Sequence, residues 1–211
     1  MELAVFGGTG RTGRALLVTA LAHGWQVRAF VRTQAGASLQ LPPGLVVVHG
    51  FADYLPDIVT AVQGTDGVCC LVGTHARSPE PFCAALTQHI VEAMRGERVR
   101  RLVCLTGAMI GALPHNVSPA VRAMARLFRW HAPDVAADRA QQEAVVMASG
   151  LDWTLVKPPR LTDGAGTGVV HADPELRVGL LDRVSRLDLA EFVFRAATQG
   201  RFVGQKVYVR S

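Results

Sequence analysis

The stretch that decides the fold is Phe6-Gly7-Gly8-Thr9-Gly10-Arg11-Thr12-Gly13, which directly follows a short apolar run and precedes a predicted helix over residues 14–22. Glycine recurs in it at every third position, as Gly7, Gly10 and Gly13. Gly7 permits a sharp turn out of the strand, Gly10 lets a pyrophosphate approach the backbone, and Gly13 lets the helix pack closely on the sheet. Strand, glycine turn and helix together predict a dinucleotide-binding motif.

Two threonines strengthen this prediction. Thr9 and Thr12 place hydroxyl donors beside the free N–H groups of a helix N-terminus, which attracts anions. The alternative is an ordinary glycine loop, which the flanking strand and helix disfavour. We therefore expect the start of the chain to bind a nucleotide.

The end of the second predicted strand, residues 26–31, indicates which nucleotide. An NAD-preferring site needs an Asp or Glu there, about 20 residues beyond the glycines, to bind the ribose 2′-hydroxyl. This chain has Arg32 instead, and no carboxylate occurs between Glu2 and Asp53. A guanidinium suits a 2′-phosphate, so Arg32 favours NADP over NAD. The alternative is an ordinary solvated arginine.

The rest of the chain alternates predicted strands with predicted helices, which indicates a parallel sheet with right-handed crossovers. Further strands are expected at residues 45–49, 67–72, 101–105, 152–157 and 207–210. Further helices are expected at residues 55–62, 81–94, 119–131, 136–148 and 187–198. The predicted fold is α/β: one Rossmann-like, doubly wound parallel sheet over residues 1–211, with the ~60 C-terminal residues as a small substrate-side extension. The continuously apolar residues 45–49 are expected to form a buried strand.

Small and polar residues follow two of the central strands. Gly73-Thr74 ends the fourth strand and Thr106-Gly107 ends the fifth. Ligands bind at the carboxyl ends of strands in such sheets, so both pairs are expected to line the cofactor's pocket, although simple strand-end turns are as compatible with the sequence. Elsewhere, Glu143 and Lys157 are expected to form a buried, structural ion pair, and Arg98, Arg100 and Arg101 a solvated loop.

Composition excludes several other classes. The chain is 49% hydrophobic and 18% charged, which is typical of a well-cored protein. No apolar run approaches the ~20 residues that span a bilayer, and the N-terminus lacks the order of a signal peptide, so a cytoplasmic location and no membrane partner are expected. The net charge of +5 is dispersed without basic runs, so no nucleic-acid partner is expected. Cysteine and histidine spacings predict no metal site.

The helix predicted over residues 119–131 carries three arginines on one face, Arg122, Arg126 and Arg129. A solvated basic face is the simpler interpretation. The alternative is a mobile lid whose arginines steer an acidic substrate.

The proton-donating pair Tyr-x-x-x-Lys of the tyrosine-dependent dehydrogenases is absent. Four residues after Tyr54 comes Ile58, and Tyr208 lies too close to the end. Redox chemistry here must use another proton donor, or none.

Several stretches together resemble the atypical short-chain dehydrogenase-like family of NAD(P)H-binding proteins. They are residues 6–13, Val31-Arg32, residues 67–74, residues 102–107, the helix from Arg139, the run Ser149-Gly150-Leu151-Asp152-Trp153-Thr154-Leu155-Val156-Lys157-Pro158-Pro159, and the ending from Ser185 to Val209. Within this family the chain looks most like the flavin reductase and biliverdin-IXβ reductase group. The Ser149–Pro159 run, in register with the glycine motif, is the most specific part of the resemblance.

This resemblance implies a monomeric or weakly associating reductase that uses NADPH and reduces a small planar acceptor, with flavin as one possible substrate. The implied cofactor-binding residues are Gly7, Thr9, Gly10, Arg11, Thr12, Gly13, Arg32, Gly73, Thr74 and Pro158. Thr106 and Arg160 are the candidate catalytic residues. Gly107 and Arg160 stand where the group's substrate pocket has a serine and a histidine, so the departure concerns the substrate rather than the cofactor.

Three functions are compatible with these residues. The first is an NADPH-dependent reductase of flavins or similar planar, conjugated acceptors. The second is a catalytically weak redox sensor that binds NADP(H) and reports to a partner. The third is a sugar-nucleotide epimerase or dehydratase, which normally needs the missing Tyr–Lys pair and a larger substrate domain.

Overall fold

The computed structural model describes residues 1–33, 41–73, 82–113 and 117–211. Its main sheet has eight strands in the order β3-β2-β1-β4-β5-β6-β10-β8. Every neighbouring pair is parallel except β10 with β8. The strands are β1 (Glu2–Phe6), β2 (Gln26–Arg32), β3 (Val46–Gly50), β4 (Gly67–Cys70), β5 (Arg101–Leu105), β6 (Asp152–Lys157), β8 (His171–Asp173) and β10 (Gln205–Arg210).

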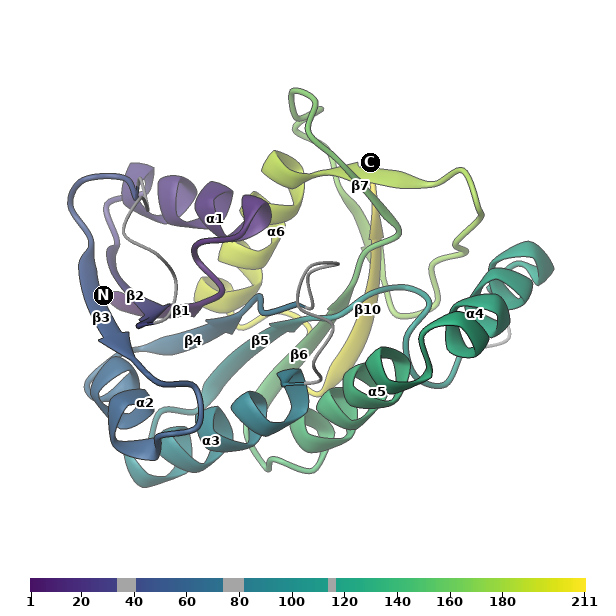
Figure 1. The fold of residues 1–211 in the computed structure, drawn as a ribbon. Coiled ribbons are helices and arrows are strands. Elements are labelled where there is room, and N and C mark those ends of the chain that lie inside the picture. The colour runs from purple at the N-terminus through teal and green to yellow at the C-terminus, as the bar shows by residue number, and fades with distance from the viewer. Residues whose placement is uncertain (34–40, 74–81, 114–116) are drawn as a thin grey trace.

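Helices cover both faces of this sheet (Figure 1). The helices are α1 (Arg11–Ala22), α2 (Leu55–Val62), α3 (Cys83–Gly96), α4 (Pro119–His131), α5 (Pro133–Met147) and α6 (Arg186–Gln199). Helices α1 and α6 pack on one face through a cluster that includes Leu16, Leu17 and Leu189. Helices α2, α3 and α5 cover the other face through a cluster that includes Ile58 and Ile90. The predicted Rossmann-like, doubly wound architecture is confirmed.

The carboxyl ends of β1, β4 and β5 meet at one edge of the sheet, because these strands are adjacent and parallel. The chain reverses its winding direction at β1, since β2 and β3 lie on one side of it and β4 to β6 on the other. A crevice at such a switch point is the general ligand site of open α/β sheets.

The expectation of a buried third strand was wrong. β3 is the edge strand of the sheet, and Val46 and Val47 are exposed. A continuous apolar run is typical of strands that are covered on both faces. The run alone does not indicate whether its strand lies at the centre or at the edge of the sheet, or whether helices cover it.

Three short strands in the C-terminal part were not predicted from the sequence. β7 (Arg160–Thr162) pairs in parallel with β9 (Arg183–Ser185), and β8 extends the main sheet. Each has only three residues, too few for an alternating pattern to be detected. These strands form the extension beyond the carboxyl ends of β5 and β6.

The expectation that Arg98, Arg100 and Arg101 form a solvated loop was wrong for Arg101. Its buried guanidinium donates to the carbonyl oxygens of Ala196, Asp152 and Arg201 and to the Thr154 hydroxyl. It thereby ties β5 and β6 to the last turn of α6, where helical carbonyl groups lack partners.

Candidate functional site

The turn between β1 and α1 adopts a conformation that requires glycine at two positions. Gly7 has φ of +84°, and a Cβ there would lie 2.7 Å from the carbonyl carbon of Leu71. A Cβ on Gly13 would collide with the carbonyl oxygen of Gly7. The turn is closed by a 3.1 Å hydrogen bond from the Gly10 N–H to the same oxygen. The chain therefore packs against itself here as the glycine spacing predicts.

Gly10 differs from these two glycines. A Cβ at Gly10 would meet only the Gly7 carbonyl oxygen, at 3.4 Å, which is an ordinary contact. The fold itself therefore tolerates a side chain at this position, although one would narrow the cleft. The missing side chain at Gly10 thus leaves space for a ligand and is not required by the packing of the protein.

The N-terminus of α1 opens into the same cleft. No side chain among the described residues caps this terminus, so the first N–H groups of the helix are available to an anion. Thr9 and Thr12 line the cleft beside it. The geometry fits a pyrophosphate, which needs such N–H donors and a close backbone approach.

The cleft above β1, β2 and β4 has a volume of about 320 Å³. Of the predicted cofactor residues, it is lined by Gly7, Thr9, Gly10, Arg11, Thr12, Gly13, Arg32 and Gly73, together with the predicted catalytic residue Thr106. Thr74 lies outside the described residues. Arg11, Arg32, Arg139 and Arg186 all border the cleft, whereas none of its described lining residues is acidic. The field in this cleft favours a ligand with several negative charges.

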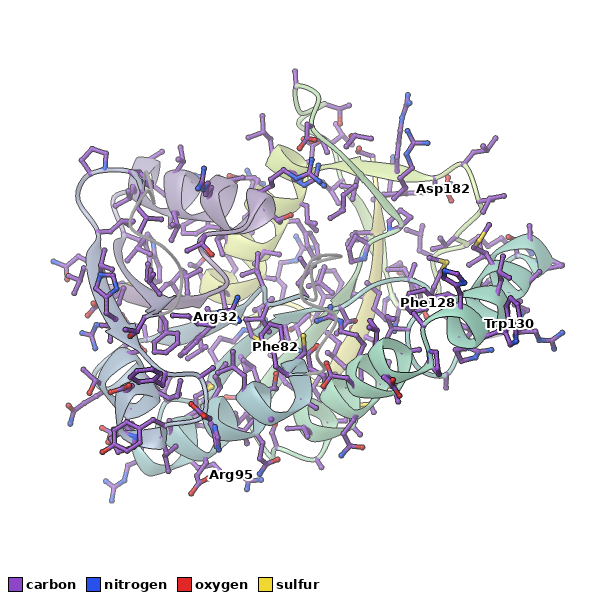
Figure 2. The ribbon with its side chains drawn as sticks, in the orientation of Figure 1. Arg32, Phe82, Arg95, Phe128, Trp130 and Asp182 are labelled. Carbon is purple, nitrogen blue, oxygen red and sulfur yellow. The ribbon has the colours of Figure 1, made fainter. Side chains whose placement is uncertain are left out.

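Arg32 lies at the end of β2 with its guanidinium 5.0 Å from the ring centroid of Phe82. Both residues line the cleft, and Figure 2 shows them close to each other. A cation–π contact orients the guanidinium plane while leaving its N–H donors free for a phosphate. The contribution of Phe82 was missed in the sequence, because its contact with Arg32 depends on how the start of α3 meets β2.

Arg11 is engaged by the protein itself. Its Nη1 lies 2.7 Å from Oδ2 of Asp163, and the other oxygen of Asp163 accepts from Arg186 at 2.5 Å. Asp163 thus links the first turns of α1 and α6 beside the cleft. Both arginines remain part of its wall.

A second hollow, of about 480 Å³, adjoins the cleft beyond the ends of β5 and β6. Its wall is mostly apolar, with Met109, Ile110, Val121, Met124, Phe128, Val135, Val178 and Leu180 among its lining residues. Arg160, at the start of β7, and Pro158 also line it. Pro158 lies in this hollow rather than in the cleft, and its carbonyl oxygen accepts from the Ala108 N–H at 2.9 Å. β7, residues 178–180 and α4 therefore help to build a second compartment.

Thr106, Arg139 and Leu161 line both compartments. The buried Arg139 of α5 donates to the carbonyl oxygens of Val72 at 2.7 Å and Leu105 at 3.0 Å, just beyond β4 and at the end of β5. Arg139 was not predicted as a site residue, although the helix from Arg139 belongs to the stretches that resemble the family. A buried arginine needs specific partners, and its partners here lie on other elements.

A buried polar network stands behind Thr106. The Thr106 hydroxyl donates to Oε1 of Glu143 at 2.8 Å, and Nζ of Lys157 donates to the same oxygen at 2.5 Å. Nζ of Lys157 also donates to the Ile110 carbonyl oxygen at 2.7 Å. The predicted buried pair of Glu143 and Lys157 is confirmed. Burial lowers the pKa of Lys157, and the attraction of Glu143 opposes that shift.

Two buried side-chain oxygens near this pair lack hydrogen-bond partners among the described residues. They are Oε2 of Glu143 and the Tyr208 hydroxyl. Oε2 of Glu143 lies 3.9 Å from Nζ of Lys206. Burial, together with Glu143, raises the pKa of Tyr208, so its phenol stays protonated. The hydrogen-bonded residues Thr106, Glu143 and Lys157 therefore lie directly behind the wall that the two compartments share.

A model of the NAD(P)H-binding family matches residues 7–200. The chain belongs to this family. The match covers the glycine turn, the Arg32 position and both compartments. It establishes an NAD(P)H-binding protein and confirms the expected resemblance at the level of the family.

Relatives and solved structures agree with this assignment. An uncharacterized chloroplastic protein of Arabidopsis thaliana is 27% identical over 181 residues, which span 81% of this chain and 63% of that protein. The anaerobilin reductase ChuY of Escherichia coli O157:H7 has a TM-score of 0.79 at 19% identity, covering 100% of this chain and 97% of its own. A short-chain dehydrogenase/reductase of Veillonella parvula in complex with NADP has a TM-score of 0.77 at 17% identity, covering 100% of this chain and 94% of its own. These structures share the fold.

Two further observations concern other ligands. Within the described ranges, no helix is long and apolar enough to cross a membrane. The same residues contain no group of three or more His, Cys, Asp or Glu side chains that could hold a metal ion.

Proposed function

We propose that the protein is an NADPH-dependent reductase of flavins or similar planar, conjugated acceptors. The observation that carries the proposal is that the arginine-lined cleft and the apolar hollow meet at Thr106, Arg139 and Leu161. A nicotinamide cofactor, when bound, supplies a hydride. The protein then has to bring an acceptor close to the cofactor and exclude water from the contact.

The preference for NADPH rests on charge. Arg32 lies where an NAD-preferring site has a carboxylate. Four arginines line the cleft, of which Arg11 and Arg186 are paired with Asp163. The phosphate esters of NADPH would engage the α1 N-terminus and Arg32, with Phe82 holding the guanidinium in place.

The acceptor side rests on the shape and chemistry of the hollow. Its apolar wall suits a conjugated ring system, because such surfaces gain free energy when they leave water. Arg160 lies at its margin and is exposed, so it can bind an acidic group of the acceptor.

Thr106 is the group that would deliver a proton. Its hydroxyl already donates within the wall of both compartments, and Glu143 and Lys157 lie behind it. In this proposal the hydroxyl donates a proton to the reduced acceptor and regains one through Glu143 from Lys157, whose lowered pKa makes release easier.

The test is to mix the protein with NADPH and FMN, FAD or a linear tetrapyrrole and to follow absorbance at ~340 nm, where the reduced cofactor absorbs. We expect turnover with at least one planar acceptor and weaker binding of NADH than of NADPH. Tight NADPH binding without turnover of any planar acceptor would contradict the reductase proposal and favour the sensor.

A further inference from the structure

Helix α4 packs on the body of the protein through only a small part of its surface. Val121 and Ala125 are its only buried residues. It contacts mainly α5, and Figure 1 shows it projecting at the edge of the molecule beyond the sheet. Most of the surface of this 13-residue amphipathic helix is therefore exposed to water.

One exposed face of α4 is apolar. Ala120, Ala123, Met124 and Leu127 follow the i, i+3, i+4, i+7 spacing that places residues on one helical face, and Trp130 continues it. Leu127 is 53% exposed and Trp130 is 79% exposed. Trp130, labelled in Figure 2, lies in the last turn of α4, close to the start of α5. Trp130 therefore buries little of its side chain against the described residues.

A neighbouring loop adds to the same surface. Leu180 is exposed, and Leu181 is 93% exposed. Leu180 and Met124 both line the apolar hollow, so the loop and α4 both contribute to its wall. We call the set of Met124, Leu127, Trp130, Leu180 and Leu181 the apolar rim.

Positive charge flanks the apolar rim. Arg126 and Arg129 lie on α4, which has no acidic residue, and Arg177 and Arg183 flank the loop. The nearest acid in the loop is already engaged, since Oδ1 of Asp182 lies 3.3 Å from Nη1 of Arg210 and its Oδ2 accepts from the Gly179 N–H. Two copies of this chain facing each other through α4 would bring like charges together, which disfavours self-association.

We propose that the apolar rim docks the protein on the surface of a lipid bilayer that contains anionic lipids. An amphipathic helix with tryptophan and leucine on one side and arginine beside them is the sequence type that lies in a membrane interface. Arginine is attracted to anionic headgroups, and the exposed leucines and tryptophan enter the boundary of the acyl chains. The expectation of no membrane partner rested on the lack of a spanning segment, which an interfacial contact does not need.

Docking in this way turns the mouth of the apolar hollow toward the bilayer, because Met124 and Leu180 belong both to the rim and to the wall of the hollow. A lipophilic ligand dissolved in the membrane could then enter the hollow without crossing water. The membrane contact itself does not depend on the proposed reductase activity.

The experiment measures binding of the full chain to vesicles of phosphatidylcholine alone and of phosphatidylcholine mixed with phosphatidylglycerol, by flotation and by tryptophan fluorescence. We expect binding to the anionic vesicles only, weakened by salt, with a blue shift that the Trp130→Phe variant loses. The double variant Leu127→Ser/Leu181→Ser should bind at least about tenfold more weakly, because it removes two isobutyl groups from the interface.

Val18→Ser is the matched control. Val18 is 55% exposed and lies on α1, which is remote from α4 in Figure 1. It should bind vesicles like the parent chain. The proposal is overturned if the parent chain does not bind anionic vesicles, if Val18→Ser weakens binding as much as the double variant, or if the double variant changes only the oligomeric state in sedimentation.

Discussion

The Thr106 hydroxyl donates to Oε1 of Glu143 over 2.8 Å, in the wall that the cofactor cleft shares with the apolar hollow. This hydrogen bond connects a side chain that a ligand can touch with a carboxylate that is buried. The dehydrogenases that use Tyr-x-x-x-Lys combine a phenol with an ammonium group. In this chain Glu143 brings the Thr106 hydroxyl and the Lys157 ammonium group together.

The first prediction concerns that hydroxyl. Thr106→Val keeps the shape of the side chain but cannot transfer a proton, so kcat should fall by roughly 100-fold, at the lower end of what general acid catalysis contributes. Thr106→Ser should retain most of the activity. NADPH affinity, measured by fluorescence titration, should be similar in both variants. Equal loss of kcat in the serine and valine variants would contradict the role of the hydroxyl.

The second prediction concerns the ion pair of Glu143 and Lys157, which lies behind Thr106. Glu143→Gln leaves the Lys157 ammonium buried without its anion, which should lower the free energy of unfolding by about 3–5 kcal/mol. The double variant Glu143→Leu/Lys157→Met removes both charges and should lose less than Glu143→Gln alone. Urea unfolding of the three proteins at neutral pH measures the difference.

This variant also has a predictable pH dependence. Burial lowers the pKa of Lys157 below its ordinary value of 10.5, and removal of Glu143 lowers it further. Between the folded and the ordinary pKa the unfolded chain binds more protons than the folded one, so stability rises with pH in that window. Glu143→Gln should therefore recover stability as the pH is raised toward 10.5. A flat pH profile would contradict this prediction and show that the Lys157 ammonium group reaches water in the variant.

The third prediction separates NADPH from NADH. Arg32→Asp should weaken NADPH binding by roughly 2 kcal/mol or more and spare NADH, because a charge-assisted contact becomes a repulsion. Arg129→Asp is the control, since it makes the same change of charge on α4, away from the cleft. Calorimetric titration of both cofactors into each variant measures the effect. An unchanged ratio of the two affinities in Arg32→Asp would show that Arg32 does not contact the 2′-phosphate.

The parts of this site that the sequence predicts share one property. The glycine turn, Arg32 and the strand-end residues Gly73 and Thr106 are fixed by local geometry and by strand order, and all of them line the cleft. Phe82 and Arg139 could not be predicted in this way. Phe82 acts through Arg32 on another element, and Arg139 acts through carbonyl groups of residues 67 and 34 positions away in the chain.

In the fold, too, features set by local sequence were predicted, and features set by contacts between distant elements were not. The strands at the centre were predicted because apolar runs of five or six residues suffice to identify them. The edge position of β3, the three-residue strands and the burial of Arg101 depend on which elements become neighbours. The substrate side consists largely of such elements, so it is less predictable than the cofactor side.

The fourth prediction concerns Asp188, which holds the extension to the body. Its carboxylate accepts from the N–H groups of Thr167 and Gly168, and its own N–H donates to the Ser185 hydroxyl at the start of α6. Burial alone would raise the pKa of this carboxyl, but the N–H donors outweigh it and hold the pKa below the ordinary value of 3.8. A lowered carboxyl pKa contributes stability that is present above the ordinary value and is lost as the pH falls through the folded value.

Asp188→Asn should therefore cost about 1–3 kcal/mol at neutral pH, because an uncharged amide cannot serve the same donors equally well. Its stability should also fall less steeply than that of the parent chain on acidification below pH 3.8. Asp173→Asn is a suitable control, since that carboxylate accepts from the Glu175 N–H in an exposed turn. Denaturant unfolding over a series of acidic pH values tests the prediction, and parallel acid profiles for Asp188→Asn and the parent chain would contradict it.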